Sequence, residues 1–456
     1  MTPLTDVDVA HLLVALALLL GSAHAVGHLF VLVRQPRVIG EITAGLLLGP
    51  TLFGAVAPGL QADIFPSDGS TAAWLGATYQ LGLMLLMFTS GAEMRSLFHR
   101  DEGRIVVTVT VTGVVLPFLA GIALFSVLDL SSLQGPADDS TALLLVFALA
   151  IAVTSIPVIS RIMLDLGIIE TSFARIVLGV AVIEDVIVYI ILALALGLVA
   201  PVAGSGVGLP ELLDLEPGSP ESLLFHAGAT RVFILVVLTI GGRGFRWSRR
   251  QRWNVLASSN SIGYYLLFLF GSTLLCVSLG ITPLLGALLA GVMASTGQGP
   301  RAVEARAAIK AFSAAFFVPI YFALVGLQLD LLRHFDVLFF LWFLVFACLA
   351  KSLSVYFGAR LAGESAQGSL NLAIATNARG GPGIVLASVA YSASIISQEF
   401  YASLVMLAIV TSLLSGTWLG RIVRRGESLR GHIEPADVAD RDVVIPRLNR
   451  PEESPR

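Results

Sequence analysis

Residues 173–200 read FARIVLGVAVIEDVIVYIILALALGLVA, an almost wholly apolar stretch that is long enough to cross a lipid bilayer as one helix. Glu184 and Asp185 stand side by side near its middle. A carboxylate at the bilayer centre costs roughly 2.5–3.5 kcal/mol on insertion scales, so it is retained only where it is paired, protonated or used. The stretch therefore predicts a membrane helix that carries a functional acid pair.

The composition of the whole chain indicates an all-α polytopic membrane protein. Its 456 residues are 56% hydrophobic and 13% charged, and the mean hydropathy is +0.87; both values are typical of helical membrane proteins. Windows of about 20 residues predict about 13 transmembrane helices. They lie near residues 9–33, 37–56, 72–93, 104–128, 141–163, 173–200, 223–242, 255–279, 281–296, 308–331, 335–360, 368–391 and 398–420.

Positive charge alternates between successive loops. Clusters of arginine follow the odd-numbered spans, whereas the opposite loops hold only Arg231 and Arg333 among basic residues. By the positive-inside rule, the N-terminus is outside and the C-terminus is cytoplasmic, which agrees with an odd number of spans in a cell (inner or plasma) membrane. Residues 421–456 form a polar tail that we expect to be disordered and too short for a folded regulatory domain.

An internal repeat relates the two halves of the membrane region, residues 1–420. The end of the third span aligns Gly91 with Gly326 of the tenth, and AGLLLG (44–49) in the second span resembles GALLAG (286–291) in the ninth. Two six-helix halves, about 9–200 and 255–420, would be joined by the linker helix 223–242. Seven spans separate equivalent helices, so the repeat has inverted topology, as in many secondary transporters. Chance similarity between apolar helices is the alternative.

Two predicted spans are interrupted at their middle, at equivalent places in the two halves. Freed main-chain groups at such breaks bind ions in transporters, and a proline removes a donor and breaks the helix. The fifth span contains Thr154, Ser155 and Pro157, and the twelfth contains Asn377, Arg379, Gly380, Gly381 and Pro382. A packing kink is the alternative for Pro157. An arginine in the middle of a span, by contrast, needs a partner.

A lysine joins these features at one depth. The chain has only two lysines, and Lys351 lies deep within the eleventh span. At 1.5 Å per residue, Asp185, Lys351, Arg379 and Thr154 each lie about 10–16 Å from an end of their span. They therefore converge near the midplane of a hydrocarbon core about 30 Å thick. This arrangement predicts a pathway for ions and protons.

Four segments resemble the monovalent cation:proton antiporter-2 family, which includes bacterial Na⁺/H⁺ and potassium-efflux antiporters. They are QPRVIGEITAGLLLGPTLFG (35–54), GITPLLGALLAGVMAS (280–295), FFVPIYFALVGLQLDL (316–331) and the acid pair, and the similarity covers about residues 9–420. It implies a core, about residues 104–200 and 335–420, that moves against a scaffold of the other helices. Two crossing unwound helices, at 154–157 and 377–383, lie in that core.

The resemblance also implies roles for single residues. The family's ion-binding aspartate falls on Asp185 and its core lysine on Lys351, whereas Glu184 departs from the usual Asp, Asn or Gln. Glu184 either faces the ion cavity or pairs with Lys351. Arg379 is expected to neutralise the broken helix, the alternative being a mobile charge. Thr154 and Ser155 offer oxygens for a hard cation, or else bond within their helix.

The favoured function is exchange of H⁺ for Na⁺ or K⁺ by alternating access. A cation-coupled symporter of an organic anion and a passive cation uniporter or channel are the alternatives. Two cycling acids plus Lys351 favour electrogenic exchange, and a permanent Glu184–Lys351 pair would give one-for-one exchange. No motif indicates an enzyme, a cofactor, nucleic acid, or a metal other than the transported cation. Small residues 21–23 and 25 favour a homodimer in the bilayer, as the family implies.

Overall fold

The computed structural model describes residues 5–33, 35–94, 102–199, 208–213, 220–251 and 254–430, and these ranges are almost entirely helical. Ten helices are long and apolar enough to cross a membrane within the described residues, and two shorter apolar helices span Ser140–Ala152 and Pro283–Ser295. The predicted all-helical membrane class is confirmed at this level. Most of the predicted polar tail, residues 431–456, lies outside the described residues.

The helices follow one another with short connections. The first part of the chain contains α1 (Asp6–Leu32), α2 (Arg37–Leu48), α3 (Phe53–Val56), α4 (Pro58–Ile64), α5 (Gly69–Met94), α6 (Gly103–Val127), the 3₁₀ turn η2 (Ser131–Leu133), α7 (Ser140–Ala152), α8 (Ile156–Asp165) and α9 (Ser172–Leu198). The second part contains α10 (Leu209–Leu212), α11 (Pro220–Val236), the π-helical turn η3 (Val237–Gly241), α12 (Gly242–Arg250), α13 (Val255–Ser259), α14 (Ser261–Ser278), α15 (Pro283–Ser295), α16 (Pro300–Phe312), the π-helical turn η4 (Ser313–Phe317), α17 (Val318–Leu327), α18 (Val337–Leu361), α19 (Ala366–Ala375), α20 (Gly380–Ser392) and α21 (Gln398–Arg424).

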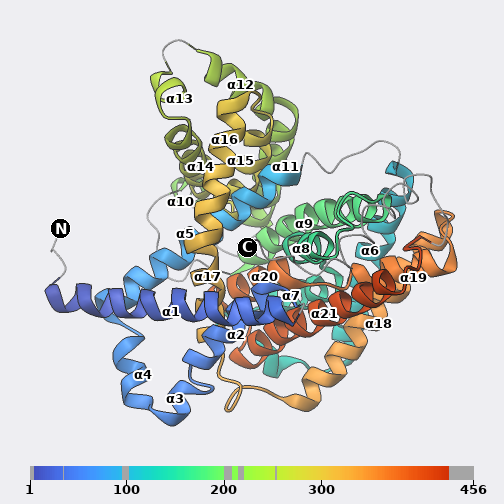
Figure 1. The fold of residues 1–456 in the computed structure, drawn as a ribbon, viewed down its shortest axis with the longest axis horizontal. Coiled ribbons are helices and arrows are strands. Elements are labelled where there is room, and N and C mark those ends of the chain that lie inside the picture. The colour runs from blue at the N-terminus through green and yellow to red at the C-terminus, as the bar shows by residue number, and fades with distance from the viewer. Residues whose placement is uncertain are drawn as a thin grey trace, which may run out of the picture.

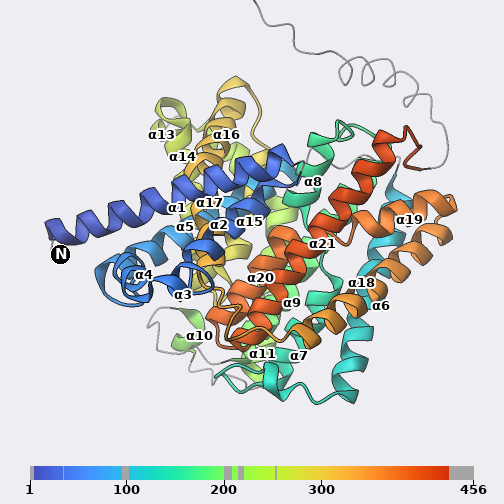
Figure 2. The same cartoon turned by 60° about the horizontal axis from the view of Figure 1, so that its bottom comes forward.

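The long helices form two groups that lie side by side (Figures 1 and 2). The first group contains α1–α5 and α14–α17, in which α15 packs on α5 and α17 packs on α2. The second group contains α6–α9 and α18–α21, in which α18 packs on α6 and α21 packs on α20. The helix made of α11, η3 and α12 contacts both groups, because α11 packs on α9 and α12 packs on α15.

Some boundaries differ from the predicted spans. α16 begins at Pro300, eight residues before the predicted span, and α21 continues to Arg424, into the stretch predicted as tail. Both extensions are polar, so a hydropathy window ends before they do. Pro300 suits a first helical turn, since a proline there loses no helical hydrogen bond. Gly299 precedes it with φ of 98°, a left-handed conformation that glycine adopts without strain.

Two crossings in the first group depend on glycine. A Cβ atom at Gly91 would lie 2.0 Å from the main-chain oxygen of Leu288, where α5 crosses α15. A Cβ atom at Gly326 would lie 2.0 Å from the main-chain oxygen of Ile42, where α17 crosses α2. No side chain fits at such separations, so the backbones of these pairs are in direct contact.

Tyrosine hydroxyl groups link the two helix groups. The Tyr189 hydroxyl on α9 donates to Met87 Sδ on α5 over 2.9 Å. The Tyr401 hydroxyl on α21 donates to the main-chain oxygen of Val325 on α17 over 3.1 Å. All of these contacts are between neutral groups in the interior.

Candidate functional site

Two membrane helices are interrupted, one at each of the predicted places. α7 ends at Ala152 and α8 begins at Ile156, with Pro157 in its first turn and the Ser155 side chain as N-cap. α19 ends at Ala375 and α20 begins at Gly380. The segments 153–155 and 376–379 are therefore extended or irregular backbone inside the second helix group.

The two breaks bind each other. The Ser155 amide donates to the Ala378 carbonyl over 2.7 Å, and the Thr154 hydroxyl donates to the Thr376 carbonyl over 2.6 Å. In return, the Gly381 amide donates to Ser155 Oγ over 2.9 Å. Several of the main-chain groups that each break frees are thus satisfied by the other break, which is how irregular backbone is tolerated away from water.

Arg379 neutralises the end of α7. Its side chain is buried and donates from Nε to Ala150 O (3.1 Å) and from Nη2 to Ile151 O (3.1 Å), both in the last turn of α7. Nη2 also reaches Ala347 O on α18 (2.8 Å), and Nη1 reaches the side-chain and main-chain oxygens of Asn377 (2.9 and 3.3 Å). All five guanidinium N–H groups are used. Positive charge at a helix C-terminus is favourable.

Lys351 pairs with Glu184. Its Nζ lies 2.7 Å from Glu184 Oε1, and both side chains have no exposed surface. Nζ also donates to Ala152 O (2.5 Å), the last residue of α7, and to Gly113 O on α6 (2.9 Å). A Cβ atom at Gly113 would lie 3.3 Å from Glu184 Oε1, so glycine lets α6 approach the pair closely. Glu184 is thus paired with Lys351 through Oε1 in this structure.

Asp185 is buried, and its carboxylate lacks a hydrogen-bond partner in the described part of the chain. Its side chain is 2% exposed, and its Oδ1 is buried without a hydrogen-bond partner among the described residues. Glu184 Oε2 is likewise buried without a described partner. An ionised carboxylate in this environment needs a proton or a cation to offset its charge.

Thr154 and Ser155 differ in what their oxygens still offer. Thr154 gives its hydroxyl proton to Thr376 O, and the lone pairs of its Oγ1 have no described donor. Ser155 Oγ accepts from the amides of Gly381 (2.9 Å) and Val158 (3.4 Å). A hydroxyl oxygen has two lone pairs, so Thr154 is free to coordinate a cation whereas Ser155 is occupied.

The predicted residues lie in one connected region. Asn377 supports Arg379 and donates to Ser352 Oγ (2.6 Å), while Gly380, Gly381 and Pro382 form the first turn of α20. The sequence does not predict that the main-chain oxygens of Ala150, Ile151, Ala152 and Gly113 act as acceptors, because a main-chain oxygen is present in every residue type. The helix break after Ala152 was the only available signal that such carbonyls would be free.

A family model described as "sodium/hydrogen exchanger, transmembrane" matches residues 14–425. The chain belongs to the sodium/hydrogen exchanger family. It is a multi-pass membrane protein by this membership and by its apolar helices. The predicted resemblance to monovalent cation:proton antiporters is confirmed, because the similar proteins of known activity are antiporters.

Two curated relatives illustrate the similarity. The chain is 27% identical over 417 residues to the Na⁺/H⁺ antiporter NhaS4 of Synechocystis sp., covering 90% of this chain and 97% of that protein. It is 25% identical over 405 residues to the Na⁺/H⁺-K⁺ antiporter GerN of Bacillus cereus, covering 88% and 93%. The chain spans about half the length of plant cation/H⁺ antiporters that it also matches.

A solved structure shows the same fold. The sodium proton antiporter MjNhaP1 of Methanocaldococcus jannaschii superimposes on this exchanger-family chain with a TM-score of 0.61 at 16% identity. The superposition covers 93% of this chain and all of the other. At this identity the likeness concerns the fold alone.

Proposed function

We propose that this protein is a secondary antiporter that exchanges protons for Na⁺ or K⁺ by alternating access. The observation that carries the proposal is the buried carboxylate of Asp185, which has no hydrogen-bond donor among the described residues. Binding either a proton or a cation would satisfy it, and the two compete for the same oxygens. Competition for one carboxylate is the simplest way to couple opposite movements of two cations.

Thr154 is the proposed second ligand of the transported cation. Its Oγ1 keeps both lone pairs, and the hydroxyl is a neighbour of Glu184. Oxygen ligands suit hard monovalent cations. Ser155 is assigned a structural role instead, because its oxygen caps α8 and α20.

Glu184 and Lys351 are proposed to remain paired through the cycle. The lysine gives all three of its protons to Glu184, Ala152 and Gly113, and releasing Glu184 would leave a buried ammonium proton without an acceptor. Asp185 alone would then exchange one proton for one cation. This departs from the electrogenic exchange that the sequence favoured.

The architecture inferred from the sequence is part of the proposal. Thirteen spans, counting the short α15 and the pairs α7–α8 and α19–α20, would form two inverted repeats with the two broken helices crossing. The glycine crossings support it, because the repeat exchanges α5 with α17 and α2 with α15. Under that exchange, the contact of α5 with α15 becomes the contact of α17 with α2, and both are present.

The moving parts are proposed to be the two helix groups. The second group, with the acid pair and both breaks, would be the mobile core, and the first group would be the scaffold of a homodimer. Gly21 and Ala25 on α1 are exposed and suit a partner helix, whereas Ala23 is buried within the protomer. The protein would lie in the plasma membrane, and its arginine-rich loops would face the cytoplasm.

Transport in proteoliposomes tests this function. A preset pH gradient is expected to collapse when Na⁺ or K⁺ is added outside vesicles that contain the protein, and Li⁺ gives a third comparison. Choline, which is too large to share Thr154 and Asp185 as ligands, serves as the control cation. Dissipation of the pH gradient without any monovalent metal cation would contradict the antiporter. So would a pH gradient that persists in the presence of each of the three cations.

A further inference from the structure

A groove runs along the helix formed by α11, η3 and α12, outside the network of the acid pair. Its volume is about 290 Å³, and it lies between this helix and the end of α15. Val237, Val292 and Met293 provide apolar lining. The polar lining comes from Thr239, Arg243, Arg246 and Thr296. The groove therefore offers two different surfaces to one ligand.

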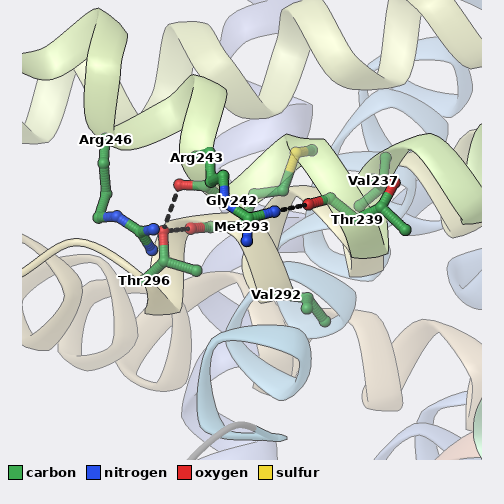
Figure 3. Close-up of a pocket in the computed structure, with 8 residues that line it drawn as sticks. All are labelled: Val237, Thr239, Gly242, Arg243, Arg246, Val292, Met293 and Thr296. Carbon is green, nitrogen blue, oxygen red and sulfur yellow. Dashed lines mark hydrogen bonds between the residues drawn. The ribbon is translucent and has the colours of Figure 1, made fainter.

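Arg246 and Val237 mark opposite ends of the groove, and the Arg243 guanidinium lies between them, against Thr239. Figure 3 shows Arg246 and Thr296 at one end and Val237 at the other. Val237 and Arg246 are nine positions apart, which is about 14 Å along a helix. The groove thus changes from apolar to cationic over a distance that matches the change from acyl chain to headgroup in a phospholipid.

The charge at the polar end is not neutralised within the described part of the chain. Arg243 Nη1 donates to the main-chain oxygen of Thr239 over 2.8 Å, and neither Arg243 nor Arg246 forms an ion pair with a described acidic side chain. Further arginines extend the basic surface on α12 and α16: Arg249, Arg250, Arg301 and Arg306. Basic clusters at the end of a membrane helix attract anionic lipids.

Trp247 places this end of the groove at the membrane boundary. It follows Arg246 on α12 and is 61% exposed, whereas Phe245 is buried at 2%. Tryptophan is enriched at the level of lipid headgroups, where its ring is apolar and its N–H is hydrated. An exposed tryptophan at this place favours headgroup depth for the arginines of α12 and a deeper position for η3.

We propose that this groove binds an anionic phospholipid. Its phosphate is held by the guanidinium groups of Arg243 and Arg246, which match phosphate geometry with several N–H donors. One acyl chain lies along Val237, Val292 and Met293. A free phosphate would use the arginines and leave the apolar surface uncovered, so the shape of the groove favours the lipid as the source of the phosphate.

Native mass spectrometry of the purified full-length protein tests the site. Phosphatidylglycerol is the anionic probe and phosphatidylcholine the zwitterionic comparison. The variant R243Q/R246Q is expected to weaken phosphatidylglycerol binding about 30-fold, since each arginine near an anionic surface contributes roughly a factor of five. The variant R421Q/R424Q removes the same charge from the end of α21, outside the groove, and is expected to bind as the unsubstituted protein does.

A second variant keeps the arginines and fills the apolar end. Thr239→Trp places an indole ring where the acyl chain is proposed to lie, and it is expected to lower phosphatidylglycerol binding at least tenfold. Glycerol 1-phosphate is the free-anion probe, and it is expected not to displace the lipid. Size-exclusion chromatography checks that each variant is folded.

Three results would overturn the proposal. Equal losses in R243Q/R246Q and R421Q/R424Q would mean attraction by net charge alone. Full phosphatidylglycerol binding by Thr239→Trp would mean that no acyl chain enters the groove. Displacement of the lipid by glycerol 1-phosphate would make the site one for a soluble phosphate. The measurement is of lipid binding, so its outcome is independent of whether ions are exchanged.

Discussion

Lys351 Nζ lies 2.7 Å from Glu184 Oε1 in a place where neither side chain reaches the surface. The two remaining ammonium protons go to the carbonyls of Ala152 and Gly113, so the lysine has no donor left to offer. Asp185, the next residue after Glu184, receives no such donor from the described residues. Two consecutive acids on one helix therefore have opposite surroundings, one compensated and one not.

Asp185→Asn is expected to abolish exchange while the protein still folds. The amide has the shape of the acid but neither carries a negative charge nor releases a proton at neutral pH. Cation-dependent collapse of a pH gradient in proteoliposomes measures the loss. Asp63→Asn, at an exposed position on α4, is the matched control and should keep full activity. Substantial coupled flux in Asp185→Asn would remove this residue as the carrier.

Lys351→Gln is expected to destabilise the protein by about 3–5 kcal/mol, because it leaves the Glu184 charge buried without its counter-ion. Glu184→Gln should destabilise the protein similarly, because it leaves the Lys351 charge buried without its counter-ion. The double variant E184Q/K351Q restores neutrality and should recover most of the loss in thermal stability. Melting of the purified variants in one detergent gives the comparison. Additive losses in the double variant would mean that the two residues do not act as a pair.

Exchange is expected to be insensitive to membrane potential. If only Asp185 cycles, one proton replaces one cation and no net charge moves. If Glu184 also cycled, each extra charge would couple to the potential by about 2.3 kcal/mol per 100 mV. Transport measured at several clamped potentials distinguishes the two schemes. An end point that shifts with voltage would show that the Glu184–Lys351 pair opens in every cycle.

Arg379→Lys is expected to reduce both stability and transport although it preserves the charge. Arginine satisfies five acceptors here, and lysine has three protons and a single nitrogen. Each buried acceptor left without a donor costs about 1–3 kcal/mol. Thermal melting and the pH-gradient assay measure the two effects. An unchanged Tm would mean that the carbonyl contacts at the end of α7 contribute little.

Gly380→Ala is expected to separate the two helix breaks. The added Cβ would lie 2.2 Å from Val158 Cγ2 and 2.8 Å from Ser155 Oγ, so one backbone has to shift. Gly383→Ala, one turn later, meets its nearest atom at 3.3 Å and is the matched control. Flux should fall strongly in the first variant and little in the second. Equal tolerance of both would show that the contact between the breaks is not needed for transport.

The sequence predicts the helical class, the broken helices and the residues of the site because each carries a local signal. A carboxylate at Asp185 or an arginine at Arg379 is too costly in a membrane to be incidental, and Pro157 cannot continue a helix. The choice of Lys351 as partner of Glu184 had no such signal, since adjacent helical residues point about 100° apart and either acid was within reach. Contacts to main-chain oxygens, as at Gly113, depend on how helices pack and leave no trace in residue type.

The hydroxyl groups of Tyr189 and Tyr401 affect how easily the two helix groups can move relative to each other. Each joins one helix group to the other through a neutral hydrogen bond. If the groups slide past one another during transport, both bonds break in every turnover. A neutral hydrogen bond contributes only about 0.5–1.5 kcal/mol net. Breaking one bond therefore slows the movement by roughly tenfold or less, and breaking both slows it by roughly a hundredfold at most. Weak contacts of this kind hold a resting position while leaving the barrier low enough for repeated cycling.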